Sequence, residues 1–337
     1  MVSEYPTPLL TIAIPTYNGS QMIKNVLDSV LSQYESNVEV LISNNCSTDS
    51  TSSILKQYKE KYPYIRIVNN STNIGPDANF LQCYQQAKGK FVLLLSDDDV
   101  LVENGLKYIL QFLEKNPEVK LVHLNTIDFR EKYIDKEHCI QSGLTPPTDI
   151  CTSNKQEFMT YAIRSWGFIS SYICSTSSIR KIINPERFFG TYWLQSYINI
   201  LCAAGENTLL GNIKYPCIGA GRYININSFD SSIVDGIYYK KMLDFAVAEA
   251  GFDKSQLEKF YIWRLCLLGS HIVVKEKASG IRITNVKRLV TITKRYPKAW
   301  FTLYPILIVP AFICKLYVNS FKALYKITTD GKINRPD

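Results

Sequence analysis

The first 125 residues alternate short apolar runs with segments whose apolar residues recur every three or four positions. The short runs predict strands at 10–14, 38–43, 65–68, 91–95 and 119–124. The helical spacing predicts helices at 23–31, from 47 or 48 to about 62, at about 79–87, and across 106–113. Strands that alternate with helices in this way indicate an α/β fold, with a mostly parallel sheet covered by helices on both faces. Such sheets bind ligands at the carboxyl ends of their strands.

Polar loops follow four of these strands at the end where ligands are expected. They read PTYN at 15–18, SNNCSTD at 43–49, a longer polar loop over 69–79, and SDDD at 96–99. Each loop alone is also ordinary turn or helix-cap chemistry. Because all four are expected at the same edge of one sheet, together they predict a single binding crevice.

Three adjacent carboxylates, Asp97, Asp98 and Asp99, directly follow the apolar run of the fourth strand. One interpretation is a solvated turn that caps the next helix. Three like charges at the end of a buried strand repel one another, however, and an unpaired buried ion is costly. Carboxylate oxygens are the ligands of hard divalent cations. The run therefore favours a site for a cation, or for a cation with a bound polyanion.

The composition is that of a globular chain with a large core, since 46% of the 337 residues are hydrophobic and 12% are aromatic. The nine cysteines form no CxxC pair and have no histidine at metal-ligand spacing, which argues against a zinc site or a disulfide framework. The first residues, MVSEYPTPLL, lack the basic start and long apolar stretch of a signal peptide. We therefore expect the catalytic part to stay in the cytoplasm, with reduced thiols.

The motifs IPTYN, SNNCSTD, NIGPDANF and AKGKFVLLLSDDD resemble those of the family 2 glycosyltransferases of GT-A fold, and most of all the bacterial surface-polysaccharide branch. The resemblance is strong over 8–125, weak over 165–230 and absent afterwards. It implies a Rossmann-like domain in which residues 1–125 bind a nucleotide sugar and residues 126–230 bind the acceptor. Residues 231–337, which the resemblance does not cover, are expected to form a mainly helical, membrane-associating region.

The resemblance also implies roles for residues in the strand-end loops. Thr16, Tyr17 and Asn18 would border the nucleobase and ribose, while the loop 73–79 would close over the base that Asn45 faces. The full set implied to bind the nucleotide sugar is Pro15, Thr16, Tyr17, Asn18, Asn44, Asn45, Asn73, Gly75, Asn79, Ser96, Asp97 and Arg222. The three aspartates fall on the metal-binding segment, and Asp98 is the first choice for direct ligation of Mn²⁺ or Mg²⁺.

Such a metal would neutralise the charge that develops on the leaving phosphate when a sugar–diphosphate bond breaks. We therefore expect a glycosyltransferase that moves a sugar to a saccharide acceptor linked to polyprenyl diphosphate. Most relatives have two aspartates where this chain has Asn44 and Asn45. An amide both donates and accepts, so it tolerates uracil without selecting it by charge. A UDP-sugar is favoured, and CDP-, dTDP- and GDP-sugars stay open.

A second departure concerns the general base. Inverting relatives usually carry an acidic pair in the region that corresponds here to residues 191–195, TYWLQ, which contain no carboxylate. A base must lie within hydrogen-bond reach of the acceptor hydroxyl. Glu186 and Asp230 join Asp98 as catalytic candidates, and Glu206 is a further possible base.

The acceptor side is expected to use aromatic side chains, because their faces suit the apolar faces of sugars. The candidates are Trp166, Tyr192, Trp193 and Gln195. Two other enzyme classes fit less well. A haloacid-dehalogenase-type phosphatase has its nucleophile on the first strand, and a nucleotidyltransferase needs a Gly-rich loop where this chain has PTYNGS. A membrane-tethered sugar-binding protein without turnover remains the alternative, supported by the missing acidic pair.

The net charge of +8 comes entirely from the end of the chain. Residues 1–280 hold 27 basic and 28 acidic residues, whereas residues 281–337 hold 11 and 2. The uncharged run AWFTLYPILIVPAFIC at 299–314 is shorter than a spanning helix and contains two prolines. We expect it to lie in the interface of an anionic membrane, on the cytoplasmic face, and not to serve nucleic-acid binding. The alternative is a buried helical hairpin, and the oligomeric state stays open.

Overall fold

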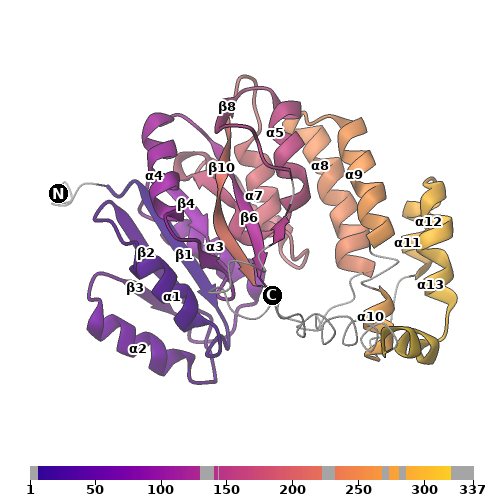
Figure 1. Cartoon of the computed structure of the whole chain (residues 1–337), viewed down its shortest axis with the longest axis horizontal. Helices are drawn as coiled ribbons and strands as arrows, with labels where there is room; N and C mark the ends of the chain where they lie inside the picture. Colours follow the sequence, from indigo (N-terminus) through magenta and orange to yellow (C-terminus); the bar gives the residue numbers. More distant parts are fainter. Residues whose placement is uncertain are drawn as a thin grey trace, which may run out of the picture. The chain divides into compact units, whose positions relative to one another are not determined.

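The computed structural model describes residues 7–129, 140–142, 144–221, 232–267, 273–280 and 286–319. The chain forms two compact units (Figure 1). The first comprises residues 1–223 with 245–253, and the second comprises residues 224–244 with 254–337. All strands of the described residues lie in the first unit, and the second is helical.

The first unit is built on one ten-stranded sheet. Its strands are β1 (Leu10–Thr16), β2 (Val38–Asn44), β3 (Arg66–Asn69), β4 (Phe91–Leu94), β5 (Val100–Leu101), β6 (Leu121–Phe129), β7 (Ile140–Ser142), β8 (Ile150–Thr152), β9 (Tyr172–Ser175) and β10 (Leu210–Gly221). The hydrogen-bonded order is β3-β2-β1-β4-β9-β6-β10-β5, with β7 paired to β6 and β8 to β10. The first four strands are parallel, so their carboxyl ends share one edge.

Helices cover both faces of this sheet (Figure 1). In the first unit they are α1 (Ile23–Leu31), α2 (Thr51–Lys61), α3 (Pro76–Gln86), α4 (Gly105–Lys115), α5 (Lys155–Ala162), α6 (Thr176–Ile179) and α7 (Leu194–Cys202), with single turns η2 (Ile163–Ser165), η3 (Ile169–Ser171) and η4 (Pro185–Phe188). Helix α3 begins at Pro76, earlier than the expected residue 79. Gly75 before it has φ +83°, and the fixed φ of proline suits the first turn of a helix.

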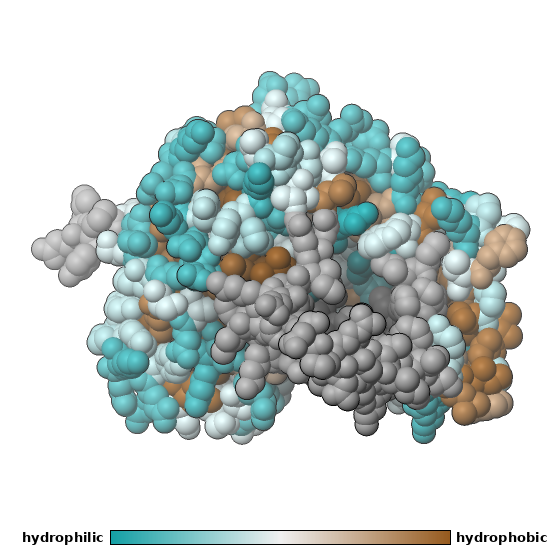
Figure 2. Space-filling model, in the orientation of Figure 1, coloured by the Kyte–Doolittle hydropathy of each residue, from teal (hydrophilic) through white to brown (hydrophobic). Residues whose placement is uncertain are grey.

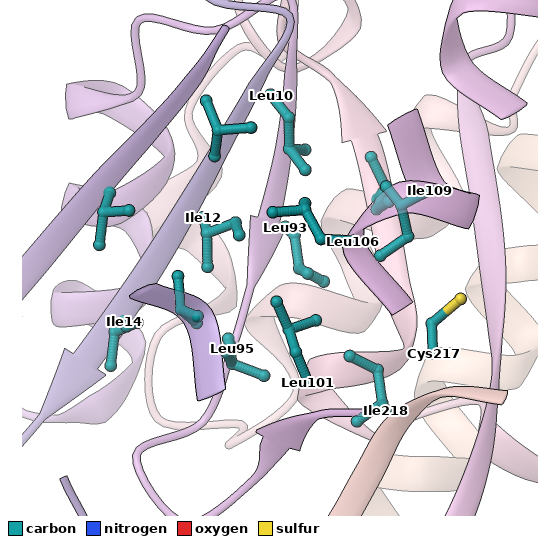
Figure 3. Packing of buried hydrophobic residues seen from close by; sticks show 14 of the residues in the cluster. Leu10, Ile12, Ile14, Leu93, Leu95, Leu101, Leu106, Ile109, Cys217 and Ile218 are labelled. Carbon is teal, nitrogen blue, oxygen red and sulfur yellow. The ribbon is translucent and has the colours of Figure 1, made fainter. Parts of the chain in front are cut away.

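Alternate residues of β1 face opposite sides of the sheet. Leu10, Ile12 and Ile14 join the apolar core that includes residues of α1 and α4 (Figure 3). Thr11 and Ala13, on the other face, are equally buried. Burying an aliphatic side chain of leucine size contributes about 1.5–3 kcal/mol. Burial on both faces explains why these strands read as continuous apolar runs in the sequence.

The α/β class and the five predicted strands are confirmed, apart from shifts at the strand ends. The sheet is mixed, however, where the sequence suggested a mostly parallel one. Strand β9, which the sequence pattern did not predict, lies antiparallel between β4 and β6. Strand β6 continues past residue 125 and pairs in parallel with β10. The division of this unit into donor and acceptor halves at residue 125 stays a prediction.

The second unit is helical, as expected for the end of the chain. Its elements are the π-helix η5 (Ser232–Tyr238), α8 (Tyr239–Ala250, whose last six residues belong to the first unit), α9 (Lys254–Leu267), α10 (Val273–Ala278), α11 (Val286–Thr293), α12 (Pro297–Thr302), α13 (Tyr304–Ile308) and a helix at Ala311–Asn319. The Arg264 guanidinium pairs with Asp235 at 2.5 Å and lies 4.2 Å from the ring centroid of Tyr239. This buried ion pair joins α9 to η5.

The apolar run at 299–314 is distributed over these last short helices. Among the described residues, no single helix combines the length and apolar character that crossing a membrane requires. Helices α12 and α13 follow each other directly and together span Pro297–Ile308. This stretch and the helix Ala311–Asn319 are bent by 104° relative to each other, and they meet those criteria only when taken together.

Candidate active site

The aspartate run begins in the turn that leaves β4 at the carboxyl edge of the sheet. The Thr16 hydroxyl, at the end of β1, donates a hydrogen bond to Asp97 Oδ2 at 2.5 Å. The Ser96 hydroxyl donates to Asp98 Oδ1 at 2.5 Å. Both carboxylates are partly exposed. Desolvation raises the pKa of Asp97 to about 6, and the charge of Asp98 adds to the shift while the Thr16 hydrogen bond opposes it.

Asp99, the third carboxylate, is buried, and its hydrogen bonds hold this turn in place. Its Oδ2 accepts a hydrogen bond from the Ser170 hydroxyl at 2.5 Å, and its Oδ1 accepts one from the Gly221 N–H at 3.0 Å. Ser170 Oγ in turn accepts from the Ser96 N–H at 2.9 Å. Burial, with the charge of Asp98, raises the pKa of Asp99 to about 8. Asp99 therefore joins η3 and the end of β10 to the turn, and the geometry does not support a direct metal contact by its side chain.

The remaining donor set suits a hard divalent cation. Within the described ranges, no three His, Cys, Asp or Glu side chains form a complete metal site. Magnesium, however, commonly uses only one or two protein carboxylates and takes its other ligands from phosphates and water. Asp97 and Asp98 meet that requirement because both are partly exposed. These two residues would hold Mn²⁺ or Mg²⁺.

The raised pKa values predict how stability depends on pH without metal. The folded protein keeps protons on Asp97 and Asp99 up to about pH 6 and 8, whereas the unfolded chain loses them near 3.8. The free energy of unfolding must therefore fall as pH rises through this window. Buried His123, whose pKa is lowered to about 4, acts in the opposite direction below pH 6.5.

We therefore expect urea midpoints measured in chelator to fall between pH 6.5 and 8, where the effect of Asp99 remains. Excess Mg²⁺ should reduce the fall, because it binds deprotonated Asp97 and Asp98 and its positive charge favours the ionised form of Asp99 next to them. Midpoints that rise over this range in chelator would contradict the assignment.

The loop after β1 exposes Tyr17 next to this turn. Pro15 is buried within β1, and Asn18 adopts φ +56°. The Asn18 side-chain carbonyl accepts from the Thr48 N–H at 2.8 Å, and the Asn18 N–H donates to Ser47 Oγ at 3.0 Å. These bonds tie the loop after β1 to the loop after β2. The half-exposed ring of Tyr17 is thus presented by two loops that brace each other.

Gly19 packs closely against Asp97. A Cβ at Gly19 would lie 2.4 Å from Asp97 Oδ2 and 2.5 Å from Thr16 Oγ1. Gly19→Ala must therefore displace the carboxylate. Since a misplacement of about 1 Å can cost about 100-fold in rate, we expect transfer to fall about 10–100-fold, with little change in the unfolding midpoint. Ser20→Ala at the next position is the control, and equal transfer rates for the two variants would contradict this contact.

Asn45 is buried, and its amide is used inside the protein. Its Nδ2 donates to Asn73 Oδ1 at 2.9 Å and to the Gly75 carbonyl at 3.3 Å. Its Oδ1 accepts from Asn70 Nδ2 and from the Ile74 N–H, both at 3.0 Å. The Asn45 amide therefore holds the 70–75 loop, and its contact with the base stays a prediction. Asn73, in that loop, is exposed.

Two other amides of the predicted nucleotide site are buried in the same way. Asn44 Nδ2 donates to Ser52 Oγ and to Asn69 Oδ1, both at 3.0 Å. Asn79 Oδ1 accepts from the Ser43 hydroxyl at 2.6 Å, and its Nδ2 donates to the Ser43 carbonyl at 3.2 Å. These amides join β2, β3 and the start of α3, and their contact with the nucleotide sugar stays a prediction.

Three of the four side chains expected to bind the acceptor are buried. The Trp166 ring packs edge-on against Phe252, with ring centroids 5.4 Å apart. Trp193 lies against Gly167, where a Cβ would come within 2.4 Å of its ring. Gln195 Nε2 donates to the Gly167 carbonyl at 3.2 Å. Core packing therefore occupies these three side chains, and their contact with an acceptor stays a prediction.

Tyr192, the fourth candidate, is exposed and is held by a residue that the sequence analysis missed. Buried Asp77, in the first turn of α3, accepts hydrogen bonds on Oδ2 from the Gly190 N–H at 2.8 Å and the Tyr192 N–H at 3.3 Å. Burial raises the pKa of Asp77, and these backbone donors oppose the shift. An acidic residue at a helix start is ordinary, so no local signal distinguished it.

The candidate bases are less constrained. Glu186 lies exposed in η4. Asp230 lies outside the described residues, as does Arg222. Their roles stay predictions.

The sequence of this chain is similar to that of several known proteins. Residues 11–181 match the sequence profile of glycosyl transferase family 2. The abequosyltransferase RfbV of Salmonella typhimurium is 32% identical over 116 residues, which cover 34% of this chain and 35% of that protein. The GalNAc(5)-diNAcBac-PP-undecaprenol beta-1,3-glucosyltransferase of Campylobacter jejuni is 27% identical over 194 residues, covering 56% of this chain and 60% of that protein.

A solved structure shares the fold. S. aureus TarS 1–349 in complex with UDP-GlcNAc superimposes with a TM-score of 0.58 at 14% identity, covering 86% of this chain and 81% of that one. The family match spans more than half of the chain, which therefore belongs to glycosyl transferase family 2. The resemblance read from the motifs and the expected GT-A fold are both confirmed. The matched stretches cover only about a third of the length of the first curated relatives, 33–35%.

Proposed function

We propose that this protein transfers a sugar from a nucleotide-diphosphate sugar to a saccharide acceptor. The observation that carries the proposal is the pair of partly exposed carboxylates, Asp97 and Asp98, at the carboxyl edge of the parallel strands. In the family this segment meets metal and diphosphate. The braced loop that exposes Tyr17 lies next to the pair, which supports a nucleotide site at the same edge.

Hydrogen bonds orient the two partly exposed carboxylates of the turn. The Thr16 hydroxyl orients Asp97, and the Ser96 hydroxyl orients Asp98. A divalent metal held by these carboxylates would supply neutralisation of the charge that develops on the leaving diphosphate. Because the carboxylates are fixed by hydrogen bonds, little reorganisation is required during the reaction.

A UDP-sugar is our first choice of donor. Its use is supported by the shared fold of TarS, whose structure holds UDP-GlcNAc. The Asn45 amide is engaged with the 70–75 loop, so it offers no charge selection for uracil. Selection of the base would then rest on the backbone of the strand-end loops and on the Tyr17 ring. CDP-, dTDP- and GDP-sugars remain to be compared.

The proposed acceptor is a saccharide linked to polyprenyl diphosphate. The Campylobacter relative, named for an undecaprenol-linked substrate, supports this class. The exposed Tyr192 ring offers an aromatic face for an acceptor sugar. The proton of the acceptor hydroxyl must leave to a base, and Glu186 and Asp230 are the proposed acceptors of that proton.

A sugar-binding protein without turnover is the second candidate, because residues 191–195 carry no carboxylate. Purified protein incubated with Mn²⁺ and a panel of nucleotide sugars separates the two. Mass spectrometry should detect free nucleotide released from one donor, and more of it when acceptor lipid is added. Absence of release from every donor with acceptor lipid present would favour the binding protein.

A further inference from the structure

The last described helices expose an unusual concentration of large apolar side chains. Of the 18 large hydrophobic residues that are exposed in the described chain, seven fall between residues 300 and 317. They are Trp300, Phe301, Ile308, Phe312, Ile313, Leu316 and Tyr317. Phe301 is 81% exposed and Ile308 is 82% exposed. Figure 2 shows brown, hydrophobic residues gathered over α12 and α13. Exposed apolar residues scattered singly need no explanation, but a cluster of this kind marks an interaction surface.

The opposite side of the same segment is anchored in the second unit. Ala299, Leu303 and Cys314 are buried. The Tyr304 hydroxyl lies 2.9 Å from Thr293 Oγ1 and donates to the Val290 carbonyl at 3.2 Å. The segment is therefore a folded element with one buried and one exposed side. A hairpin buried on all sides is not observed.

A lysine of α10 stabilises the bend between the helices Pro297–Ile308 and Ala311–Asn319. Lys277 Nζ donates hydrogen bonds to the carbonyls of Ile306 and Leu307, both at 3.0 Å, and to that of Val309. The last carbonyls of a helix have no partner within it, so a lysine there satisfies them and complements the helix dipole. Pro310 then prevents the helix from continuing in the same direction. The apolar side chains are thus presented by a preformed bent element.

The charged residues of this segment are all basic. Residues 286–319 contain six basic residues and no acidic residue. Lys287, Arg288, Lys294, Lys298 and Lys315 are exposed. Arg295 is also exposed, and it lies 3.6 Å from Glu258. Apolar side chains with lysines beside them match the anionic interface of a lipid bilayer, where apolar groups enter the headgroup region and cations stay with the phosphates.

We propose that the helices Pro297–Ile308 and Ala311–Asn319 together form a docking surface for an anionic lipid bilayer. Their exposed apolar side chains would enter the headgroup region of one leaflet. The proposal does not rest on the transferase activity. A second copy of this chain is a poorer occupant, since pairing the surface with itself would bring two sets of lysines together. Docking at a bilayer would also bring a lipid-linked acceptor to the protein.

The test is sedimentation of the full chain with vesicles of phosphatidylcholine alone and with vesicles that also contain phosphatidylglycerol. We expect binding to the anionic vesicles at low salt, at least about tenfold stronger than to the neutral ones, and weakened by high salt. The triple variant Phe301→Ser, Ile308→Ser, Phe312→Ser should lose at least about tenfold in affinity. Truncation before Ala299 is a poorer test, because it removes buried Leu303 as well.

A matched control replaces three exposed apolar residues of the first unit, Leu144→Ser, Ile183→Ser and Leu209→Ser. This control should bind as the unmodified chain does. Equal binding by the Phe301 triple variant, or a full chain that stays in the supernatant with anionic vesicles at low salt, would overturn the proposal. A dimer in solution that the Phe301 triple variant dissociates, without vesicle binding by either protein, would overturn it in favour of self-association.

Discussion

Replacing Asp98 with asparagine is expected to reduce sugar transfer by about 10²–10³-fold or more while the fold stays intact. The variant loses a carboxylate that would hold the metal, and the Ser96 hydroxyl can still donate to the remaining side-chain carbonyl. Folding should not suffer, because the charge of Asp98 raises the pKa of both Asp97 and Asp99. Removing that charge relieves repulsion, so the metal-free variant should be as stable as the parent or more stable.

Asp99→Asn provides the contrast. Its side chain is buried, and both carboxyl oxygens accept hydrogen bonds, from Ser170 and Gly221. A protonated carboxyl can keep both bonds, whereas the NH₂ group of asparagine cannot accept either. The expected result is a loss of stability of about 1–3 kcal/mol, because a buried polar group is left unsatisfied. Urea unfolding and nucleotide release, measured on both variants, separate the two roles. Unchanged turnover in Asp98→Asn would remove the metal assignment, and an Asp99→Asn variant as stable as the parent would remove the structural one.

Replacing Asp77 with alanine is expected to destabilise the first unit by about 1–3 kcal/mol, because the hydrogen bonds that this buried carboxylate accepts from two backbone N–H groups are lost. Asp77 Oδ2 accepts from the N–H groups of Gly190 and Tyr192. Because Tyr192 is the exposed residue proposed to meet the acceptor, the variant should also raise KM for acceptor more than KM for donor.

The control for this effect is Asp28→Ala. Asp28 is exposed and accepts a hydrogen bond from the Tyr58 hydroxyl at 2.6 Å, so water can replace its carboxylate. We expect the Asp28 change to cost less than about 0.5 kcal/mol. Thermal unfolding of the three proteins, with donor and acceptor KM values for each, measures both parts. If Asp77→Ala and the Asp28→Ala control unfold at the same temperature, the loop 190–193 does not depend on the Asp77 carboxylate.

Local sequence patterns were sufficient to predict the strands and helices whose formation depends on neighbouring residues. The apolar runs at 10–14 and 91–95 predicted β1 and β4, because strands buried on both faces must be apolar throughout. The spacing of Ile23, Val26 and Val30 predicted α1, whose apolar face is buried as expected. The aspartate run was located correctly at the carboxyl edge, since parallel strands end on the same side of a sheet.

The task of each polar side chain was decided by the tertiary structure. The sequence suggested that Asn45 faces the base, and in the folded chain its amide is hydrogen-bonded to the 70–75 loop. Trp166 and Trp193 were expected to face an acceptor, and both rings are buried. A sequence window reports that a residue is aromatic or polar, but its exposure depends on which distant segments pack against it.

The sequence by itself therefore determined the family, the α/β class and the position of the aspartate turn, because motifs and hydrophobic periods are properties of neighbouring residues. Only the tertiary structure placed β9 between β4 and β6 and brought Asp77 to Gly190, 113 residues away. It also separated the partly exposed pair Asp97 and Asp98 from buried Asp99. These outcomes depend on contacts between segments far apart in the chain. Such contacts produce no recognisable pattern among neighbouring residues.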